Sequence, residues 1–242
     1  MGTLGTVISE LARSQKSAVG VSLYSRWVNR PLGRPLAAVA VRLGVSADGV
    51  TAASAAVSGL ALVALCTWPP SFALGVVVAL LLVLGFALDS ADGQVARYTG
   101  TGSAAGEWLD HVVDAGKHVA VHGAVLIAWF RFELVPSDRW LLVPLAYQLV
   151  AVVVFAAGTL EPLLRRASGT PAPRTPSTVR ALALLPADFG ILAGAFLLWG
   201  APAAFRVVYT ALLVLTTLVG AALLVRWSRA LRARQGSPAS AP

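Results

Sequence analysis

Eight residues in one short stretch of this sequence have the types and spacing that chemistry requires. They are Asp89, Asp92, Gly93, Ala96, Arg97, Gly106, Asp110 and Asp114. At ~100° per residue, the first five occupy one face of a helix. The last three share one face of a second helix, because four-residue steps nearly return to the same side. A turn is predicted at residues 99–102, so two acidic helix faces meet across it.

The acids of this stretch need cations. Five of the chain's 11 acidic residues lie between positions 89 and 114 against one basic residue, Arg97, although the whole chain carries a net charge of +8. Converging carboxylates near hydrocarbon repel one another unless they are protonated or bind cations. Their oxygen ligands suit a hard ion, so we expect two Mg²⁺ or Mn²⁺ ions rather than zinc. Such ions can neutralise a diphosphate while one carboxylate takes a proton from an attacking hydroxyl, which predicts phosphoryl transfer.

The small residues of the stretch predict a close approach of the two helices. Gly93, Ala96 and Gly106 add almost no side chain, so the helices can approach closely or admit a flat ligand such as a nucleobase. A structural alternative is that the aspartates cap helix ends and pair with Arg97 and Lys117. Two basic residues cannot neutralise five acids, and buried charges are seldom left unpaired, so the metal site is the preferred interpretation.

The rest of the chain has the composition of a membrane protein. Of its 242 residues, 57% are hydrophobic and only 12% are charged, about half the charged share of soluble domains. Six apolar runs approach the ~20 residues that a helix needs to cross a bilayer. They lie near 50–68, 71–88, 108–130, 140–160, 181–200 and 204–227. We therefore predict an all-α integral membrane bundle of six transmembrane helices at 50–227, with an N-terminal arm and juxtamembrane segment at 1–49 and a tail at 228–242.

The distribution of Lys and Arg predicts the orientation of this bundle. With the N-terminus inside, fifteen of the 19 basic residues lie on the cytoplasmic side, where positive charge is in excess. Both termini and the acidic stretch are then cytoplasmic, in a multi-pass protein of the cell membrane. The arginines flank membrane segments instead of forming a soluble binding face, so membrane lipids, and no nucleic acid, are the expected partners.

Residues 21–44 have an amphipathic pattern. Arg26, Arg30 and Arg34 recur every four residues, and apolar residues fill the gaps. The pattern predicts an interfacial segment along the cytoplasmic leaflet, kinked or divided by Pro31 and Pro35. A solvated linker is the alternative.

The stretch LDSADGQVARYTGTGSAAGEWLDHVVDAG resembles the signature of the CDP-alcohol phosphotransferase family, also called CDP-alcohol phosphatidyltransferases. That signature reads Asp-x2-Asp-Gly-x2-Ala-Arg-x8-Gly-x3-Asp-x3-Asp, and every fixed position and gap is present. The six predicted spans, the cytoplasmic N-terminus and the amphipathic arm are also similar to that family. The resemblance implies a dimetal centre, with Asp114 also the general base. Its metal ligands would be Asp89, Asp92, Asp110 and Asp114.

The resemblance also implies a site for the CDP portion of a donor. Its residues would be Gly93, Ala96, Arg97, Ser103 and Gly106. The segment Ala47-Asp48-Gly49-Val50-Thr51 resembles the family's Pro-Asn/Asp-x-x-Thr turn near the nucleotide, with Ala47 in the Pro position. Asp48 and Thr51 are therefore weaker candidates for nucleotide contacts.

Other polar residues lie outside the signature. Lys117 is a candidate for acceptor binding or an intrahelical partner of Asp114. An anionic acceptor could be held by basic residues after the fourth span, which also fit the ordinary positive charge of a cytoplasmic loop. These residues are Arg165, Arg166 and Arg180. His118 and His122 share a helix face, and a packed polar contact is preferred there to a metal-ligand pair.

These observations predict a membrane transferase of phospholipid biosynthesis. It would move a phosphatidyl group from a CDP-alcohol, with CDP-diacylglycerol favoured, to a hydroxyl acceptor and release CMP; cytidine enters only through the resemblance. The nearest alternative is the same chemistry with a soluble CDP-alcohol donor and a lipid acceptor. A divalent-cation transporter, which predicts acids near mid-membrane in several spans, and a non-catalytic scaffold are further alternatives. The resemblance also favours a homodimer.

Overall fold

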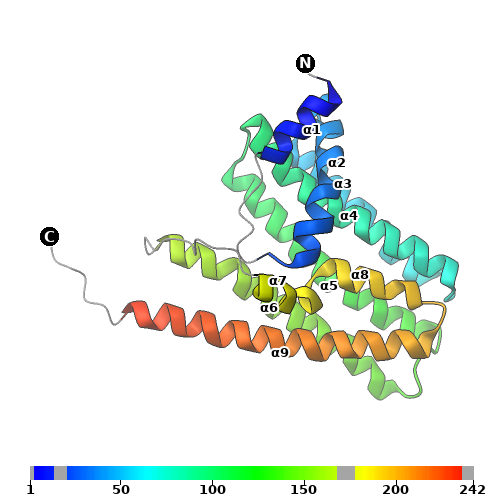
Figure 1. Cartoon of the computed structure of the whole chain (residues 1–242). Coiled ribbons are helices and arrows are strands. Elements are labelled where there is room, and N and C mark those ends of the chain that lie inside the picture. The colour runs from blue at the N-terminus through cyan, green and yellow to red at the C-terminus, as the bar shows by residue number, and fades with distance from the viewer. Residues whose placement is uncertain (1–2, 14–20, 168–177, 236–242) are drawn as a thin grey trace.

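A computed structural model describes residues 3–13, 21–167 and 178–235, and these form helices and loops without a strand. Figure 1 shows the arrangement. The helices are α1 (Leu4–Arg13), α2 (Arg30–Arg42), α3 (Ala47–Thr67), α4 (Phe72–Thr99), α5 (Ala104–Arg131), α6 (Leu142–Ala167), α7 (Thr178–Ala183), α8 (Phe189–Ala195) and α9 (Pro202–Gln235). Short π or 3-10 segments are η1 (Ser25–Asn29), η2 (Asp138–Leu141), η3 (Leu185–Ala187) and η4 (Phe196–Leu198). The predicted all-α class is confirmed.

Four stretches of the described chain are long and apolar enough to cross a membrane. They are α3, α4, η2 with α6, and α9. Helix α5 has the same 28-residue length as α4 but carries charged side chains along its first half. The predicted boundaries at 49 and 227 fall inside helices, because α3 begins at Ala47 and α9 continues to Gln235. The chain is an all-α bundle of the multi-pass membrane type.

The apolar run predicted as a span at 181–200 is not one continuous helix. Helix α7 ends at Ala183, Pro186 lies in the 3-10 turn η3, and α8 starts after Asp188. The Asp188 carboxylate caps α8 by accepting a hydrogen bond from the Gly190 amide at 2.9 Å. A proline has no amide hydrogen to continue a helix, and an aspartate favours the start of a new one. The apolar stretch 189–198 is about half the ~20 residues of a span, so this segment does not confirm the count of six.

The predicted amphipathic segment is helical, but its prolines do not divide it. Pro31 lies in the first turn of α2, which directly continues the π-helical turn η1. Pro35 lies inside α2 without ending it. The irregularity comes earlier, in the π-helical turn η1.

Helix α2 packs closely on α4 and turns an apolar face outward. A Cβ at Gly33 would lie 3.0 Å from the Ala87 carbonyl oxygen, so only glycine permits this approach without a shift. The Gln94 side-chain amide donates to the Arg30 carbonyl at 3.2 Å and fixes the two helices together. Trp27 is 72% exposed and Leu32 is 44% exposed, as expected for a face that contacts lipid.

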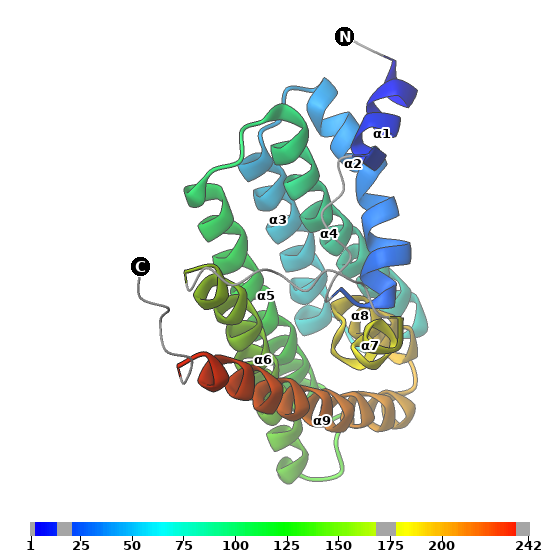
Figure 2. The same cartoon turned by 60° about the vertical axis from the view of Figure 1, so that its left-hand side comes forward.

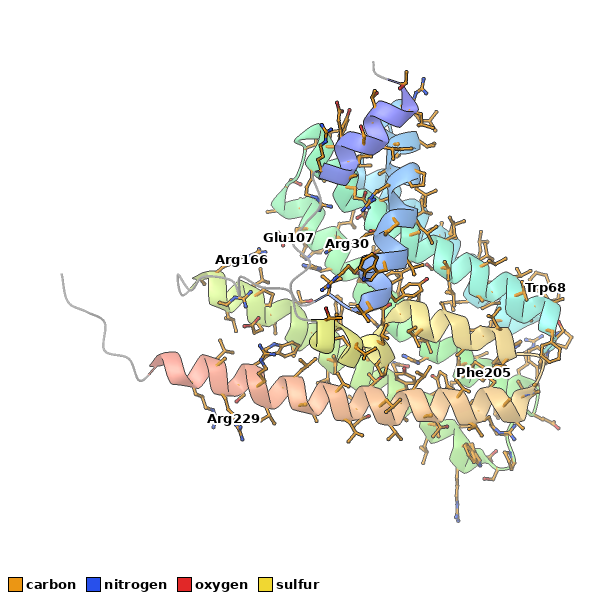
Figure 3. The ribbon with its side chains drawn as sticks, viewed as in Figure 1. Arg30, Trp68, Glu107, Arg166, Phe205 and Arg229 are labelled. Atoms are coloured by element: carbon orange, nitrogen blue, oxygen red, sulfur yellow. The ribbon has the colours of Figure 1, made fainter. Side chains whose placement is uncertain are left out.

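Aromatic side chains form the centre of the core. Trp129, Phe196, Trp199, Phe205 and Tyr209 are fully buried and bring α5, η4 and α9 together. Phe205 packs against Trp199 with ring centroids 4.8 Å apart in an edge-to-face arrangement. In Figure 3, Phe205 and Trp68 lie toward one end of the bundle, and Glu107, Arg166 and Arg229 lie toward the other.

The contact between α4 and η4 generates a prediction about stability. A Cβ at Gly75 would overlap the Phe196 carbonyl oxygen and lie 3.0 Å from the Trp199 Cβ. We expect Gly75→Ala to destabilise the fold by about 1–3 kcal/mol, since backbone atoms cannot rotate away as a side chain can. Thermal unfolding of the purified protein in detergent would show this as a Tm lowered by several degrees.

The matched control is Gly59→Ala in α3, where no atom lies within 4 Å of the added methyl group. Its Tm should stay the same or rise slightly, because alanine favours helix more than glycine does. Equal Tm values for the two variants would contradict the close contact at Gly75.

Candidate metal and substrate site

A tight turn connects the acidic end of α4 to the start of α5. Gly100 ends α4 in the left-handed conformation with φ +69°, which favours glycine. Ser103 caps α5 by accepting a hydrogen bond from the Gly106 amide at 3.0 Å. Ser103, which is predicted to contact the CDP portion, therefore also starts the helix that carries two of the aspartates.

The small residues do not make the direct α4–α5 contact expected from the sequence. Helix α3 packs against both helices and lies between them in Figure 2. A Cβ at Gly106 would lie 3.1 Å from the Asp48 Oδ1 of α3, and a Cβ at Gly93 would lie 3.1 Å from the Arg97 Nη1. Gly106 therefore leaves room for Asp48, and Gly93 leaves room for the Arg97 guanidinium.

Three of the four aspartates form a group that can hold a metal ion. Asp89, Asp92 and Asp110 each bring one carboxylate oxygen to within 4.8 Å of the others. Asp92 is only 5% exposed, and its Oδ2 accepts a hydrogen bond from the Thr51 Oγ1 at 2.7 Å. Thr51, a weaker candidate for a nucleotide contact, orients a carboxylate of this group. Three carboxylate oxygens are the ligand type that Mg²⁺ and Mn²⁺ prefer.

Asp114 is linked to the group through Lys117. The Lys117 Nζ donates to the Asp89 carboxylate and to the Asp114 Oδ1, the latter at 3.1 Å. The predicted intrahelical pairing of Lys117 with Asp114 is therefore confirmed. The ion-pair alternative accounts for part of the acidic charge, but the two positive charges of Lys117 and Arg97 cannot balance four carboxylates.

Arginines approach the same end of α4 from two elements. The Arg97 guanidinium lies over Gly93, the residue that directly follows Asp92. Arg30 belongs to α2, and its pKa is lowered by burial first and then by the positive charges of Arg97 and Arg26. Arg30 of the juxtamembrane arm therefore lies near Arg97 of α4.

The basic residues at the end of α6 contact carboxylates. Arg165 pairs with Glu161 at 3.5 Å, and Arg166 approaches Glu107 of α5 at 3.7 Å. The second contact places the end of α6 beside the start of α5, as Figure 3 shows. The Arg180 side chain lies outside the described part of the chain, so acceptor binding by these three arginines stays a prediction.

His118 and His122 of α5 make packed contacts, as the sequence favoured. The His122 Nδ1 lies 2.6 Å from the Tyr209 hydroxyl, and the His122 ring stacks on Tyr147 at a centroid distance of 4.2 Å. The His118 ring lies 5.1 Å from that of Phe155. The partners of these two histidines come from α6, α8 and α9, which no local spacing in the sequence indicates.

Asp188 is a buried polar residue that the sequence argument missed. Its carboxylate accepts hydrogen bonds from the Ser22 and Ser25 hydroxyls, the second at 2.8 Å, and so ties the N-terminal arm to α8. Burial and the nearby Asp188 charge raise the pKa of Tyr24, which lies between the two serines in the sequence. The only sequence signal for Asp188 was its place before a helix, where an aspartate is a common cap.

Comparison with known proteins agrees with the geometry. A family model described as CDP-alcohol phosphatidyltransferase matches residues 44–227, which include all four aspartates and most of the described helices. A search of curated proteins found no match. The match covers more than half of the chain and confirms the resemblance seen in the signature. The chain belongs to the CDP-alcohol phosphatidyltransferase family.

Proposed function

We propose that the protein transfers a phosphatidyl group from CDP-diacylglycerol to a hydroxyl acceptor and releases CMP. Family membership supports CDP-alcohol phosphotransfer in phospholipid synthesis as the general activity. The observation that carries the proposal is the convergence of Asp89, Asp92 and Asp110 inside the matched region. The long apolar helices around this group favour a donor that carries its lipid in the membrane.

The four aspartates would hold two divalent ions, Mg²⁺ or Mn²⁺. Asp89, Asp92 and Asp110 would supply carboxylate oxygens to these ions, and Asp114, which shares the contact of Lys117 with Asp89, would supply a further one. When bound, the ions would offset the negative charge of the diphosphate and of the leaving group. Binding at Asp89 and Asp114 requires Lys117 to move from the two oxygens that it contacts here.

The chain's own residues would orient the reactants and move one proton. Asp114 accepts the proton of the acceptor hydroxyl, whose oxygen attacks the phosphorus next to the lipid alcohol as the bond to CMP breaks. Arg97 contacts the CDP phosphates from its position over Gly93. The small surfaces of Ala96 and Gly106 leave space for the nucleotide.

Asp48 and Ser103 would complete the nucleotide surface at the start of α3 and α5. We propose that this end of the bundle faces the cytoplasm, because Arg166 and Arg229 lie toward it in Figure 3 and cytoplasmic segments carry excess positive charge. Both termini would then be cytoplasmic in the cell membrane. Assembly as a homodimer is part of the proposal on the family resemblance alone.

Metal binding provides the first test of this function. Asp92→Asn removes a carboxylate from the group and should abolish Mn²⁺ binding, measured by electron paramagnetic resonance of the purified protein. Thr51→Val removes the hydrogen bond that orients Asp92 and should weaken Mn²⁺ binding by about 10–100-fold. Asp138→Asn, in η2 outside the group, is the matched control and should bind Mn²⁺ like the unchanged protein. Normal Mn²⁺ binding by Asp92→Asn would contradict the proposed metal site.

Removal of the proposed general base provides the second test. Asp114→Asn should lower the rate of CMP release by about 10²–10⁴-fold, because the acceptor proton has no carboxylate to receive it. CMP release is measured with Mg²⁺, CDP-diacylglycerol and a set of acceptors: glycerol phosphate, inositol phosphate, inositol and serine. A parallel reaction with a soluble CDP-alcohol and a lipid acceptor distinguishes the opposite polarity.

Glu107→Gln is the control, since Glu107 lies on the same helix but is half exposed and outside the group. It should keep full activity. An Asp114→Asn protein that releases CMP as fast as Glu107→Gln would show that Asp114 is not the base.

A further inference from the structure

A cavity of about 190 Å³ lies among α5, α6, the η3–α8 turn and α9. Its size is well above the ~10–15 Å³ that holds one water molecule, so a small organic molecule can enter. Tyr147, Phe155 and Leu192 supply aromatic and aliphatic wall, and His118, His122 and Thr216 supply polar groups. The four aspartates are not among the described residues that line the cavity.

The cavity begins one helical turn beyond the proposed base. His118 lines it and follows Asp114 by four residues, so the two side chains share one face of α5 about 6 Å apart along the helix axis. Lys117, next to His118, contacts both Asp89 and Asp114. A molecule held in the cavity can therefore present a hydroxyl group past His118 toward the Asp114 carboxylate.

The polar atoms of the cavity wall suit hydroxyl groups. The Thr216 Oγ1 donates to the Pro186 carbonyl at 3.0 Å and lies 3.3 Å from the Tyr147 hydroxyl. His122 is 1% exposed, and among the described residues its Nε2 has no hydrogen-bond partner. A threonine hydroxyl and an imidazole nitrogen can each exchange a hydrogen bond with an alcohol.

The charge on the cavity wall opposes a phosphorylated ligand. Among the described residues that line the cavity, none is Lys or Arg, and the one carboxylate is that of Asp188. Asp188 is buried and already accepts from Ser22, Ser25 and the Gly190 amide. A phosphate group here would add negative charge beside this carboxylate with no cation among the described lining residues to pair with it, which a buried site disfavours. Arg165 and Arg166, expected from the sequence as candidates for an anionic acceptor, do not line the cavity.

We propose that this cavity is the acceptor subsite and that it admits an uncharged polyhydroxy compound in preference to its phosphate ester. This inference rests on the transferase function proposed above. One acceptor hydroxyl loses its proton to Asp114 and forms a bond to the phosphorus that carries the lipid alcohol. The bond between that phosphorus and the CMP oxygen breaks, and CMP leaves with the electron pair. The other hydroxyls stay in the cavity against Thr216 and His122.

Matched acceptors test the inference on the unchanged protein. CMP release with Mg²⁺ and CDP-diacylglycerol is compared for inositol against inositol phosphate and for glycerol against glycerol phosphate. In at least one pair, we expect kcat/KM for the uncharged compound to be at least about tenfold higher than for its phosphate ester. A difference of this size corresponds to the cost of one or two unmatched polar contacts. Equal or faster reaction with the phosphate esters overturns the cavity assignment but leaves the transferase proposal intact. Absence of CMP release from every donor and acceptor overturns the transferase proposal itself.

A filled cavity tests the location. Ala151 is a buried lining residue of α6, so Ala151→Phe should raise the acceptor KM at least about tenfold by occupying the space, while CDP binding with Mg²⁺ stays unchanged. Val153→Phe is the matched control, because Val153 is 42% exposed on the same helix and does not line the cavity. Thr216→Val changes no volume and should raise the same KM about fivefold through loss of one hydrogen bond. An unchanged acceptor KM in Thr216→Val and Ala151→Phe overturns the inference.

Discussion

The repulsion among four carboxylates near the ends of two long helices, α4 and α5, is the constraint on which the rest of this structure depends. Like charges gathered next to hydrocarbon are unfavourable unless cations or hydrogen-bond donors offset them. Lys117 and Thr51 supply part of that compensation, through Asp89, Asp114 and Asp92. Negative charge remains on the carboxylates, and divalent ions can neutralise it. The helices around the site have to hold this arrangement against its own repulsion.

Helix α5 carries most of the polar chemistry, in successive turns along one helix. Asp110 and Asp114 lie nearest its start, Lys117 and His118 follow, and His122 lies deeper in the bundle. This stripe explains why α5 is less apolar than its neighbours, and polar residues of this kind within a membrane helix usually have functional roles. The same stripe connects the acidic group to the cavity, so reaction and acceptor binding would share one rigid element.

The sequence predicts the long helices and the acidic group well, because both depend on local spacing. The sequence prediction fails at 181–200, because a count of apolar residues does not register where a helix ends. Pro186 cannot donate a backbone hydrogen bond, and Asp188 starts a new helix. It also fails to place α3 between α4 and α5, because periodicity shows which face a residue occupies but not which helix it meets. The contact of Lys117 with Asp89 spans 28 residues, and that of His122 with Tyr209 spans 87, so no local pattern indicates either pair.

The position of a bound divalent ion tests the central claim most directly. The measurement is anomalous diffraction from crystals of the protein grown with Mn²⁺ and CDP. We expect one peak at about 2.1 Å from oxygens of Asp89, Asp92 and Asp110 and a second between Asp89 and Asp114, with Lys117 moved from both carboxylates. Crystals with bound CDP but no anomalous peak among these aspartates, and with Lys117 still between Asp89 and Asp114, would contradict the account.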